Sequence, residues 1–290
     1  MTKHFFIGVD GGATKCIVRV EDQAGQLLGR ESAGPANIRI SVEQAWQSIY
    51  AALKKILHPN AIQLENPQYH FHMGLGLAGC EILSSYDAFI NTPHHFKTLK
   101  LTSDAHTACL GAHDGKDGTI IIAGTGVVGF QVSAKETHKI AGWGFPHDDE
   151  GGGAWMGLEA VKLTLQWLDE RIVSSGLTQA IFAHFHEDIN ELVAWANQAN
   201  STAFAQLAPI VITENEKGDD AARTILQRAA HALDKIWVTL QAKQKAELAC
   251  ALIGGISTYL QPYLSERLQE RLISPKAPPD VGAVWLVKSI

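Results

Sequence analysis

Cysteine is scarce in this chain of 290 residues, which has four scattered cysteines, Cys16, Cys80, Cys109 and Cys250. None of them stands in a C-x-x-C pair, the spacing typical of structural zinc sites and redox dithiols. The sequence therefore predicts neither a zinc site nor a disulfide framework. Reduced and mostly buried thiols are the expected state.

Long apolar runs and basic stretches are missing too. No uninterrupted run approaches the roughly 18 apolar residues of a membrane span, and no charged leader precedes the first strand-like segment. We therefore expect a cytoplasmic protein without a membrane partner. The net charge of −6 and the pI near 6.1 argue against a nucleic-acid partner, because such proteins need a basic surface. A Walker A motif is also absent.

The composition is that of a globular protein, with 46% hydrophobic and 19% charged residues. The length is enough for two domains, each with its own core. A polar, turn-rich segment at 114–118 indicates a boundary near residue 115. We expect an N-terminal domain over 1–115, with 280–290 as a candidate completion, and a C-terminal domain over 116–279.

The most informative segment is Asp10-Gly11-Gly12-Ala13-Thr14-Lys15, called here the first glycine turn. It joins two apolar, strand-like runs, 5–9 and 16–20. Consecutive glycines let backbone N–H groups approach an anion closely, and the Asp10 carboxylate is suited to the Mg²⁺ that accompanies a nucleotide. The segment predicts an ATP site.

A second copy of this pattern follows later in the chain. The apolar run 119–123 leads into Gly124-Thr125-Gly126, called here the second glycine turn, and then into the run 127–132. Both copies continue as hairpins, with turns at 22–25 and 134–137. This duplication predicts two half-sites that face each other across a cleft.

Periodicity gives the expected elements between these turns. Ser41 and Gln44 resemble a capping box before a helix over 42–57, and strands are expected near 69–73 and 96–102. The first half thus reads β-β-β-α-β-α-β and then α. In the second half we expect three strands over 119–141, a helix over 221–244 and a strand over 248–253. The segment 281–287 is a candidate to pack against the rest of the protein.

Asp104 follows the expected strand 96–102 directly. One interpretation is a simple N-cap of the helix over 105–110. The other is catalytic, because ligand chemistry in α/β proteins gathers at the carboxyl ends of strands, where a carboxylate can accept a hydroxyl proton during phosphoryl transfer. The local sequence leaves both open.

A loop over 142–153, called here the Trp143 loop, combines an aromatic residue, three acids and five glycines. Short acids offer acceptors for sugar hydroxyls, although a solvated acidic turn is the plain alternative. The histidines of 70–72, 94–95 and 184–186 offer no complete metal-ligand set. The preferred interpretation is that these histidines alternate along the surface of a strand or helix.

Two segments match the dinucleotide pattern G-x-G-x-x-G, 74–79 and 124–129. A Rossmann site needs a strand, the glycines and then a helix. Strand-like residues follow the second match, whereas a helix over 82–90 would suit the first. The Rossmann alternative leaves the two glycine turns unexplained and is therefore not preferred.

Taken together, these motifs resemble the sugar-kinase/Hsp70/actin superfamily and, within it, the BadF/BadG/BcrA/BcrD ATPase family, most closely its N-acetylglucosamine and glucosamine kinases. The resemblance covers essentially the whole chain, including Asn37, Gly254-Gly255 and the ending 282–286. It implies an α/β fold with two ribonuclease-H-like (actin-like ATPase) domains, whose mixed sheets are flanked by helices and separated by a cleft. It also suggests a homodimer.

The resemblance also implies roles for individual residues. Asp104 would be the general base, Asp10 would hold Mg²⁺, and ATP would contact Gly11, Gly12, Ala13, Thr14, Lys15, Gly124, Thr125, Gly126, Gly254 and Gly255. The amino sugar would contact Asn37, Asp104, Gly142, Trp143, Gly144, Asp149 and Glu150.

Two residues depart from the family pattern, in which a third glycine is usual at Ala13 and a serine is common at Val127. Alanine requires a negative φ there, and valine lacks a hydroxyl that could bond phosphate or sugar.

The expected reaction is transfer of the ATP γ-phosphate to the 6-hydroxyl of N-acetylglucosamine, with glucosamine as the alternative substrate. An ATP-driven activator of the same family is the other alternative. That branch carries an iron–sulfur cluster, which the scattered cysteines do not readily supply.

Overall fold

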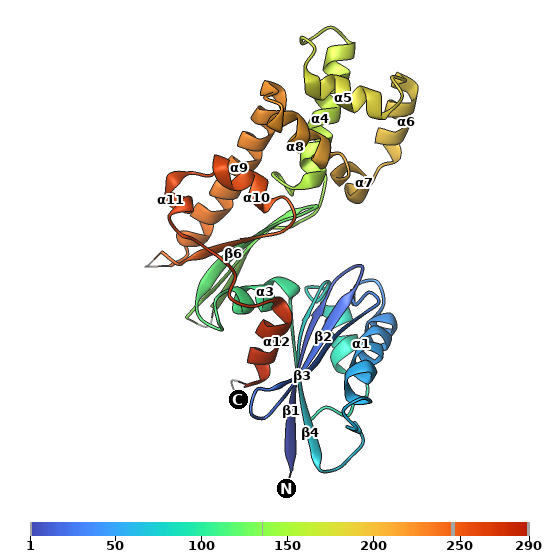
Figure 1. Ribbon diagram of the computed structural model, residues 1–290, viewed down its shortest axis with the longest axis vertical. Helices are drawn as coiled ribbons and strands as arrows, with labels where there is room; N and C mark the ends of the chain where they lie inside the picture. Colours follow the sequence, from blue (N-terminus) through green and yellow to red (C-terminus); the bar gives the residue numbers. More distant parts are fainter. Residues whose placement is uncertain (1, 135, 245–246, 289–290) are drawn as a thin grey trace. The chain divides into compact units, whose positions relative to one another are not determined.

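The computed structural model describes residues 2–134, 136–244 and 247–288. The chain divides into two compact units: unit 1 contains Met1–Gly118, Gln131–Thr137 and Ser274–Ile290, and unit 2 contains Thr119–Phe130 and His138–Ile273. The end of the chain, red in Figure 1, thus joins the unit that the first strands build. Whether the units are the independent domains expected from the sequence stays a prediction. Lys135 of the predicted second turn and residues 289–290 of the predicted completing segment lie outside the described residues.

Unit 1 is built around a five-stranded sheet of order β3-β2-β1-β4-β5. Strands β1, β4 and β5 are parallel, and β1-β2 and β2-β3 are antiparallel. The predicted order of elements in the first half is confirmed. The elements are β1 (Lys3–Gly11), β2 (Cys16–Asp22), β3 (Leu27–Ala33), α1 (Val42–Leu57), β4 (Tyr69–Leu77), α2 (Leu83–Ile90), β5 (Thr98–Thr102), α3 (Asp104–Ala112) and α12 (Pro279–Lys288).

The second sheet has the order β10-β9-β6-β7-β8. The three strands predicted over 119–141 and the long helix predicted over 221–244 are present, the helix ending slightly earlier. The elements are β6 (Gly118–Ala123), β7 (Val127–Ser133), β8 (Glu136–Ala141), α4 (Gly153–Leu168), α5 (Gly176–His184), α6 (Ile189–Gln198), α7 (Ser201–Ala205), α8 (Ala208–Glu216), α9 (Asp220–Gln241), β9 (Cys250–Ile253), α10 (Ser257–Leu260), the 3₁₀ turn η1 (Gln261–Tyr263), α11 (Glu266–Gln269) and β10 (Leu272–Ile273).

The two sheets share one topology, which confirms the predicted duplication. In each, three strands that are consecutive in the sequence lie side by side, and two later strands add next to the first of them. The turn at 22–25 is formed as predicted, since the Asp22 amide donates to the Gln26 carbonyl at 3.0 Å and Gly25 has a φ of +83°.

The two faces of the first sheet are covered by different helices, as Figure 1 shows. Alternate residues of β1, including Ile7 and Val9, are fully buried in a core that contains Ile49 and Leu53 of α1. The Ser41 hydroxyl caps α1 by accepting the Gln44 amide. The residues between, such as Gly8 and Asp10, belong to the opposite face, which α12 and α3 cover.

Glycines let these two helices lie directly on the strands. A Cβ on Gly8 would stand 1.9 Å from the Asp280 carbonyl oxygen, and one on Gly74 would stand 1.9 Å from the carbonyl oxygen of Ala283. A Cβ on Gly76 would meet Thr107 of α3 equally closely. The G-x-G pattern at 74–76 is therefore inside β4 and serves packing, so the Rossmann alternative is wrong.

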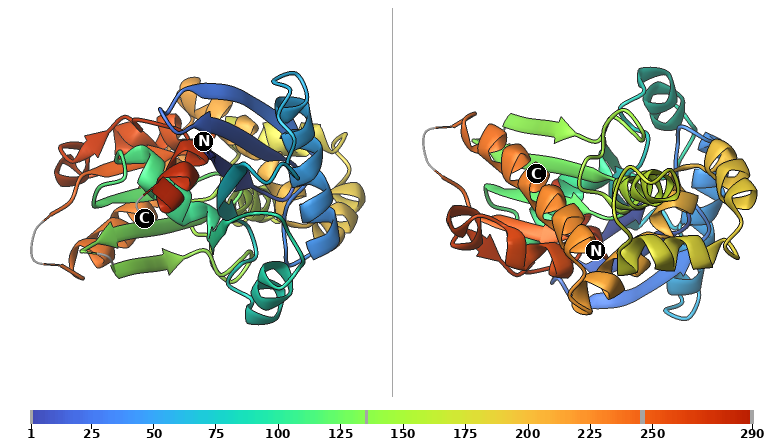
Figure 2. Two further views of the ribbon diagram at one scale, coloured as in Figure 1. Left: turned by 90° about the horizontal axis from the view of Figure 1, so that it is seen from below. Right: turned by 90° about the horizontal axis from the view of Figure 1, so that it is seen from above.

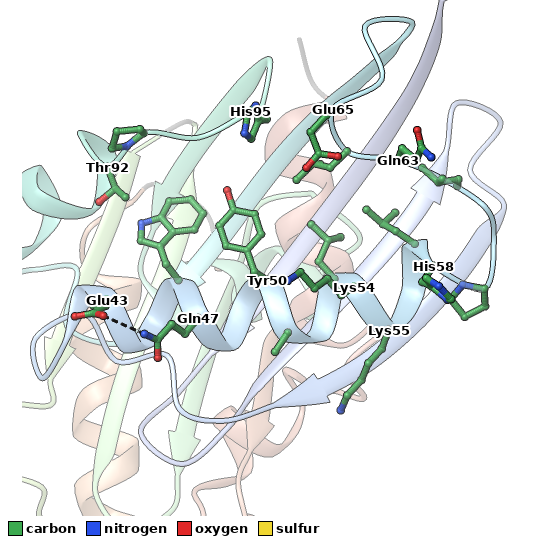
Figure 3. A pocket seen from close by; sticks show the side chains of 18 of the residues that line it. Glu43, Gln47, Tyr50, Lys54, Lys55, His58, Gln63, Glu65, Thr92 and His95 are labelled. Atoms are coloured by element: carbon green, nitrogen blue, oxygen red, sulfur yellow. Dashed lines mark hydrogen bonds between the residues drawn. The ribbon is translucent and has the colours of Figure 1, made fainter.

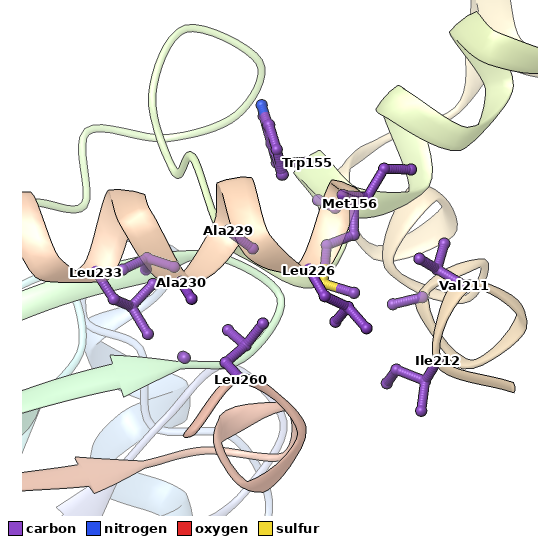
Figure 4. Packing of buried hydrophobic residues seen from close by; sticks show 14 of the residues in the cluster. Trp155, Met156, Val211, Ile212, Leu226, Ala229, Ala230, Leu233 and Leu260 are labelled. Carbon is purple, nitrogen blue, oxygen red and sulfur yellow. The ribbon is translucent and has the colours of Figure 1, made fainter. Parts of the chain in front are cut away.

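In unit 2, α9 runs along the second sheet (Figure 2) and supplies much of the core. Its buried residues include Leu226, Ala230 and Leu233, and Trp155 and Met156 of α4 belong to the same cluster (Figure 4). The strong amphipathic period over 221–244 made this helix predictable. None of the helices within the described residues is long and apolar enough to span a bilayer.

Candidate active site

The carboxyl ends of β1, β4 and β5 lie at one edge of the first sheet because these strands are parallel. The first glycine turn follows β1 at this edge, and the Gly12 amide donates to the Lys15 carbonyl at 3.0 Å. Ala13, Thr14 and Lys15 are exposed. Ala13 has no positive φ, so the alanine fits where the family has glycine.

Asn37 lies beside this turn. The Ala36 amide donates to the Gly12 carbonyl at 3.0 Å, and the Ile38 amide donates to the Ala78 carbonyl just beyond β4 at 3.1 Å. The Asn37 side chain accepts the Arg39 amide at 3.0 Å. Unit 1 thus brings together the first glycine turn and one predicted sugar residue.

Asp104 is the first residue of α3 and not its N-cap. The cap is Ser103, whose hydroxyl accepts the His106 amide, so the predicted capping role of Asp104 is wrong by one residue. The Asp104 carboxylate accepts the amide of Ala105 at 2.8 Å. The capping requirement of α3 is met by Ser103, so the catalytic interpretation of Asp104 stays a prediction.

The acids of this edge act on one another. Burial, and then the nearby carboxylates of Asp104 and Asp280, raise the pKa of Asp10 to about 6, although Arg30 and Lys15 oppose this. A bound cation would relieve the repulsion among these carboxylates. Mg²⁺ that arrives with a nucleotide is held by the phosphates and only one or two carboxylates, so Asp10 alone fits it as the candidate ligand.

Sequence reasoning missed Asp280, the second residue of α12. Its side chain is fully buried and takes two hydrogen bonds from Arg30, at 2.8 and 3.0 Å. In the sequence Asp280 resembles an ordinary acid in a first helical turn. Its partner is 250 positions away, so no local pattern could have found the pair.

The second sheet offers a matching edge, because β6 and β9 are also parallel. The second glycine turn follows β6, and Gly254-Gly255 follow β9. No atom lies within 4 Å of a Cβ position on Gly124 or Gly255, whereas one on Gly254 would stand 2.1 Å from the Ala123 carbonyl oxygen. Gly124 and Gly255 thus leave backbone open to a ligand, which fits the phosphates and adenosine of ATP.

The Trp143 loop is held by its own acids. The Asp148 carboxylate accepts the Trp143 amide at 2.8 Å, and Asp149 accepts the Val127 amide at 3.2 Å. Burial raises the pKa of Asp149. Trp143 is 83% exposed, and Lys139 lies 5.6 Å from its ring centre. The Val127 side chain is buried in the core, so it does not line the second glycine turn.

The predicted site residues are divided between the units. Unit 1 contains Asp10 to Lys15, Asn37 and Asp104, and unit 2 contains the second glycine turn, the Trp143 loop with Glu150, and Gly254-Gly255. Among the described residues no group of three His, Cys, Asp or Glu side chains could hold a metal ion. The roles of the predicted site residues stay predictions.

A large cavity of about 1550 Å³ lies elsewhere in unit 1, between α1 and the segments that follow it. Figure 3 shows Tyr50 on α1 pointing toward the segments that carry Glu65 and His95. This helix covers the sheet face opposite to Asp10. The cavity is therefore separate from the candidate active site.

Comparison with known proteins agrees with this arrangement. The model of the BadF/BadG/BcrA/BcrD ATPase family matches residues 7–287. The chain belongs to this family. It is 33% identical to a glucosamine kinase of Vibrio cholerae over 97% of this chain and 95% of that protein. A Clostridium acetobutylicum N-acetylmuramic acid/N-acetylglucosamine kinase is 24% identical, with 98% of each chain covered.

The structure is also similar to that of a Chromobacterium violaceum protein described provisionally as an N-acetylglucosamine kinase. The TM-score is 0.85 at 30% identity, with 98% of both chains covered. The predicted fold, two mixed sheets flanked by helices, is confirmed. The similarity to the amino-sugar kinases of Vibrio cholerae and Clostridium acetobutylicum thus extends over 97–98% of the chain.

The open backbone at Gly124 gives a test of the second glycine turn. We expect Gly124→Val to lower ATP affinity at least about tenfold, since its side chain would occupy the space of a phosphate. Sugar affinity and thermal stability should change little, because the new Cβ meets no atom within 4 Å. Calorimetric titration with each ligand measures both affinities.

Gly157→Val in α4 is the matched folding control. Its Cβ would stand 2.0 Å from the Phe204 carbonyl oxygen, so it should lower the melting temperature clearly. Equal losses of ATP and sugar affinity in the Gly124 variant would contradict a phosphate-binding role.

Proposed function

We propose that this protein is an ATP- and Mg²⁺-dependent kinase that phosphorylates the 6-hydroxyl of an amino sugar. The observation that carries the proposal is the presence of glycine turns at equivalent edges of the two sheets, with Asp10 and Asp104 at the edge of the first, in a chain similar to a glucosamine kinase over 97% of its length. In this proposal the backbone amides of both glycine turns bind the phosphates.

Asp104 supplies the acid–base step. Located at the carboxyl end of β5, its carboxylate orients the sugar hydroxyl and accepts the proton as phosphoryl transfer proceeds. Asp10 would hold the Mg²⁺ ion, which neutralises phosphate charge when bound. Asn37 and the acids of the Trp143 loop offer acceptors for the other sugar hydroxyls.

Between the two substrates expected from the sequence, we favour glucosamine. Its free amine is a cation when protonated, and the Trp143 loop carries three acids, Asp148, Asp149 and Glu150. The 33% identity to a glucosamine kinase supports the same choice. N-Acetylglucosamine is the second candidate, supported by the provisional description of the Chromobacterium violaceum relative.

An assay of sugar-dependent ADP release can test both the kinase activity and the choice of sugar. We expect kcat/KM for glucosamine to exceed that for N-acetylglucosamine and glucose by roughly tenfold or more, the discrimination that a polar contact provides. Phosphorus NMR of the product should locate the phosphate on the 6-oxygen. Preference for the acetylated sugar would select the second candidate, and ADP release unaffected by any sugar would favour the ATP-driven activator.

A further inference from the structure

The ion pair between Arg30 and Asp280 is unusual in its burial. The Asp280 side chain is 0% exposed, whereas the Arg30 side chain is 41% exposed. Arg30 Nε donates to Oδ2 at 2.8 Å and Nη2 donates to Oδ1 at 3.0 Å. A pair with a fully buried carboxylate adds little net stability, because removing that charge from water costs about as much as the attraction returns. Its position calls for a reason other than stability.

Asp280 lies near Asp10, and Arg30 reaches Asp280 from two strands away. The carbonyl oxygen of Asp280 is 1.9 Å from the Cβ position of Gly8, and Asp10 is two residues further along the same face, roughly 7 Å away. Arg30 is opposite Arg19 in the β2-β3 register, and Arg19 is opposite Gly8. An anion and a cation are thus held at fixed places next to the candidate metal ligand.

We propose that Asp280 and Arg30 are positioning residues that set the divalent-cation affinity of Asp10 in opposite directions. Asp280 strengthens cation binding, Arg30 weakens it, and the two hydrogen bonds keep the balance constant. The affinity for bare metal then stays low, so that the ion arrives and leaves with the nucleotide. This inference rests on the proposed function in taking Asp10 as the Mg²⁺ residue.

A purely structural role for the Arg30–Asp280 pair makes a different prediction. If the pair only fastened α12 to the sheet, then breaking it from either side would loosen the same contact and shift metal affinity in the same direction. The chain offers a matched control at the other end of α12, where Lys288 pairs with Glu21 at 2.5 Å while Glu21 also accepts Arg19 at 2.6 Å. Glu21 is opposite Phe6, four residues before Asp10, roughly 13 Å away and beyond the usual screening length.

The experiment measures Mn²⁺ binding to the full-length protein by electron paramagnetic resonance, with and without ADP. We expect Asp280→Asn to weaken binding roughly tenfold or more, as is typical when a partner near a metal ligand is removed. Arg30→Met should tighten binding several-fold, and Arg30→Lys should stay near the wild type because the charge remains. The double variant should return toward the wild type, and Lys288→Met, which leaves the Arg19–Glu21 pair in place, should have no effect.

Shifts of the two single variants in the same direction would overturn the inference, as would a Lys288→Met effect equal to that of Asp280→Asn. If Asp280→Asn does not fold, the sign of the Arg30→Met shift decides alone. Asp10→Asn distinguishes a failure of this inference from a failure of the proposed metal site. If this variant abolishes Mn²⁺ binding while the pair variants change nothing, only the present inference fails; if it leaves Mn²⁺ binding intact, the proposed metal site fails as well.

Discussion

Asp104→Asn is expected to lower turnover by roughly 10²–10⁴-fold, the loss typical when a general base is removed. Asparagine has nearly the same shape and can still accept the Ala105 amide that Asp104 accepts at 2.8 Å. The fold and sugar affinity should therefore persist. Steady-state kinetics, calorimetric sugar titration and thermal melting together measure the three properties.

Ser103→Ala is the matched control for this variant. It removes the true cap of α3 and should cost about 1 kcal/mol of stability, yet turnover should fall far less than in Asp104→Asn. Near-normal turnover in a folded Asp104→Asn protein would refute the catalytic role. A larger loss in the cap variant would indicate that helix placement, and not proton transfer, is what matters.

Asp10→Asn is expected to abolish most activity while stabilising the metal-free protein at neutral pH. The pKa of Asp10 is raised from 3.8 to about 6 in the fold, so the folded state prefers the protonated acid. This preference costs stability progressively as pH rises from the unfolded value through about 6. Asparagine removes a penalty of roughly 1–3 kcal/mol, since one pKa unit corresponds to about 1.4 kcal/mol.

Denaturant unfolding with a chelator present, at pH 4 and pH 8, measures the effect. The variant should exceed the wild type in unfolding free energy at pH 8, and the difference should nearly vanish at pH 4, where the wild-type carboxyl is largely protonated in the fold and nearly half protonated in the unfolded chain. Equal differences at both pH values, or destabilisation at pH 8, would show that the electrostatic account of Asp10 is incorrect.

The sequence was sufficient for the order of elements in the first half and for the two glycine turns, because each rests on a local signal. The run before Asp10 and the run before Gly124 have strand character, and α9 has a clear helical period. Duplicated topology followed from the repetition of these local signals. The edge on which Asp10 and Asp104 meet could be expected, since carboxyl ends of parallel strands gather together.

What the sequence could not supply depends on contacts between distant segments. Gly74 and Gly76 matched a nucleotide pattern, yet they are glycines because α12 and α3 lie against β4. The Arg30–Asp280 pair spans 250 positions. The cap of α3 was misplaced by one residue because Ser103 and Asp104 are both good capping residues.

The return of α12 to the first sheet also determines when unit 1 can complete its fold during synthesis. Residues 1–118 are made first, but the helix that covers Gly8 and Gly74 follows all of unit 2 in the sequence. At bacterial and eukaryotic elongation rates of 5–20 residues per second, the intervening chain takes roughly 10–30 s to make. Throughout that time the face of the sheet that carries Asp10 is covered by α3 alone. We therefore expect unit 1 to complete its fold only after unit 2 has been made.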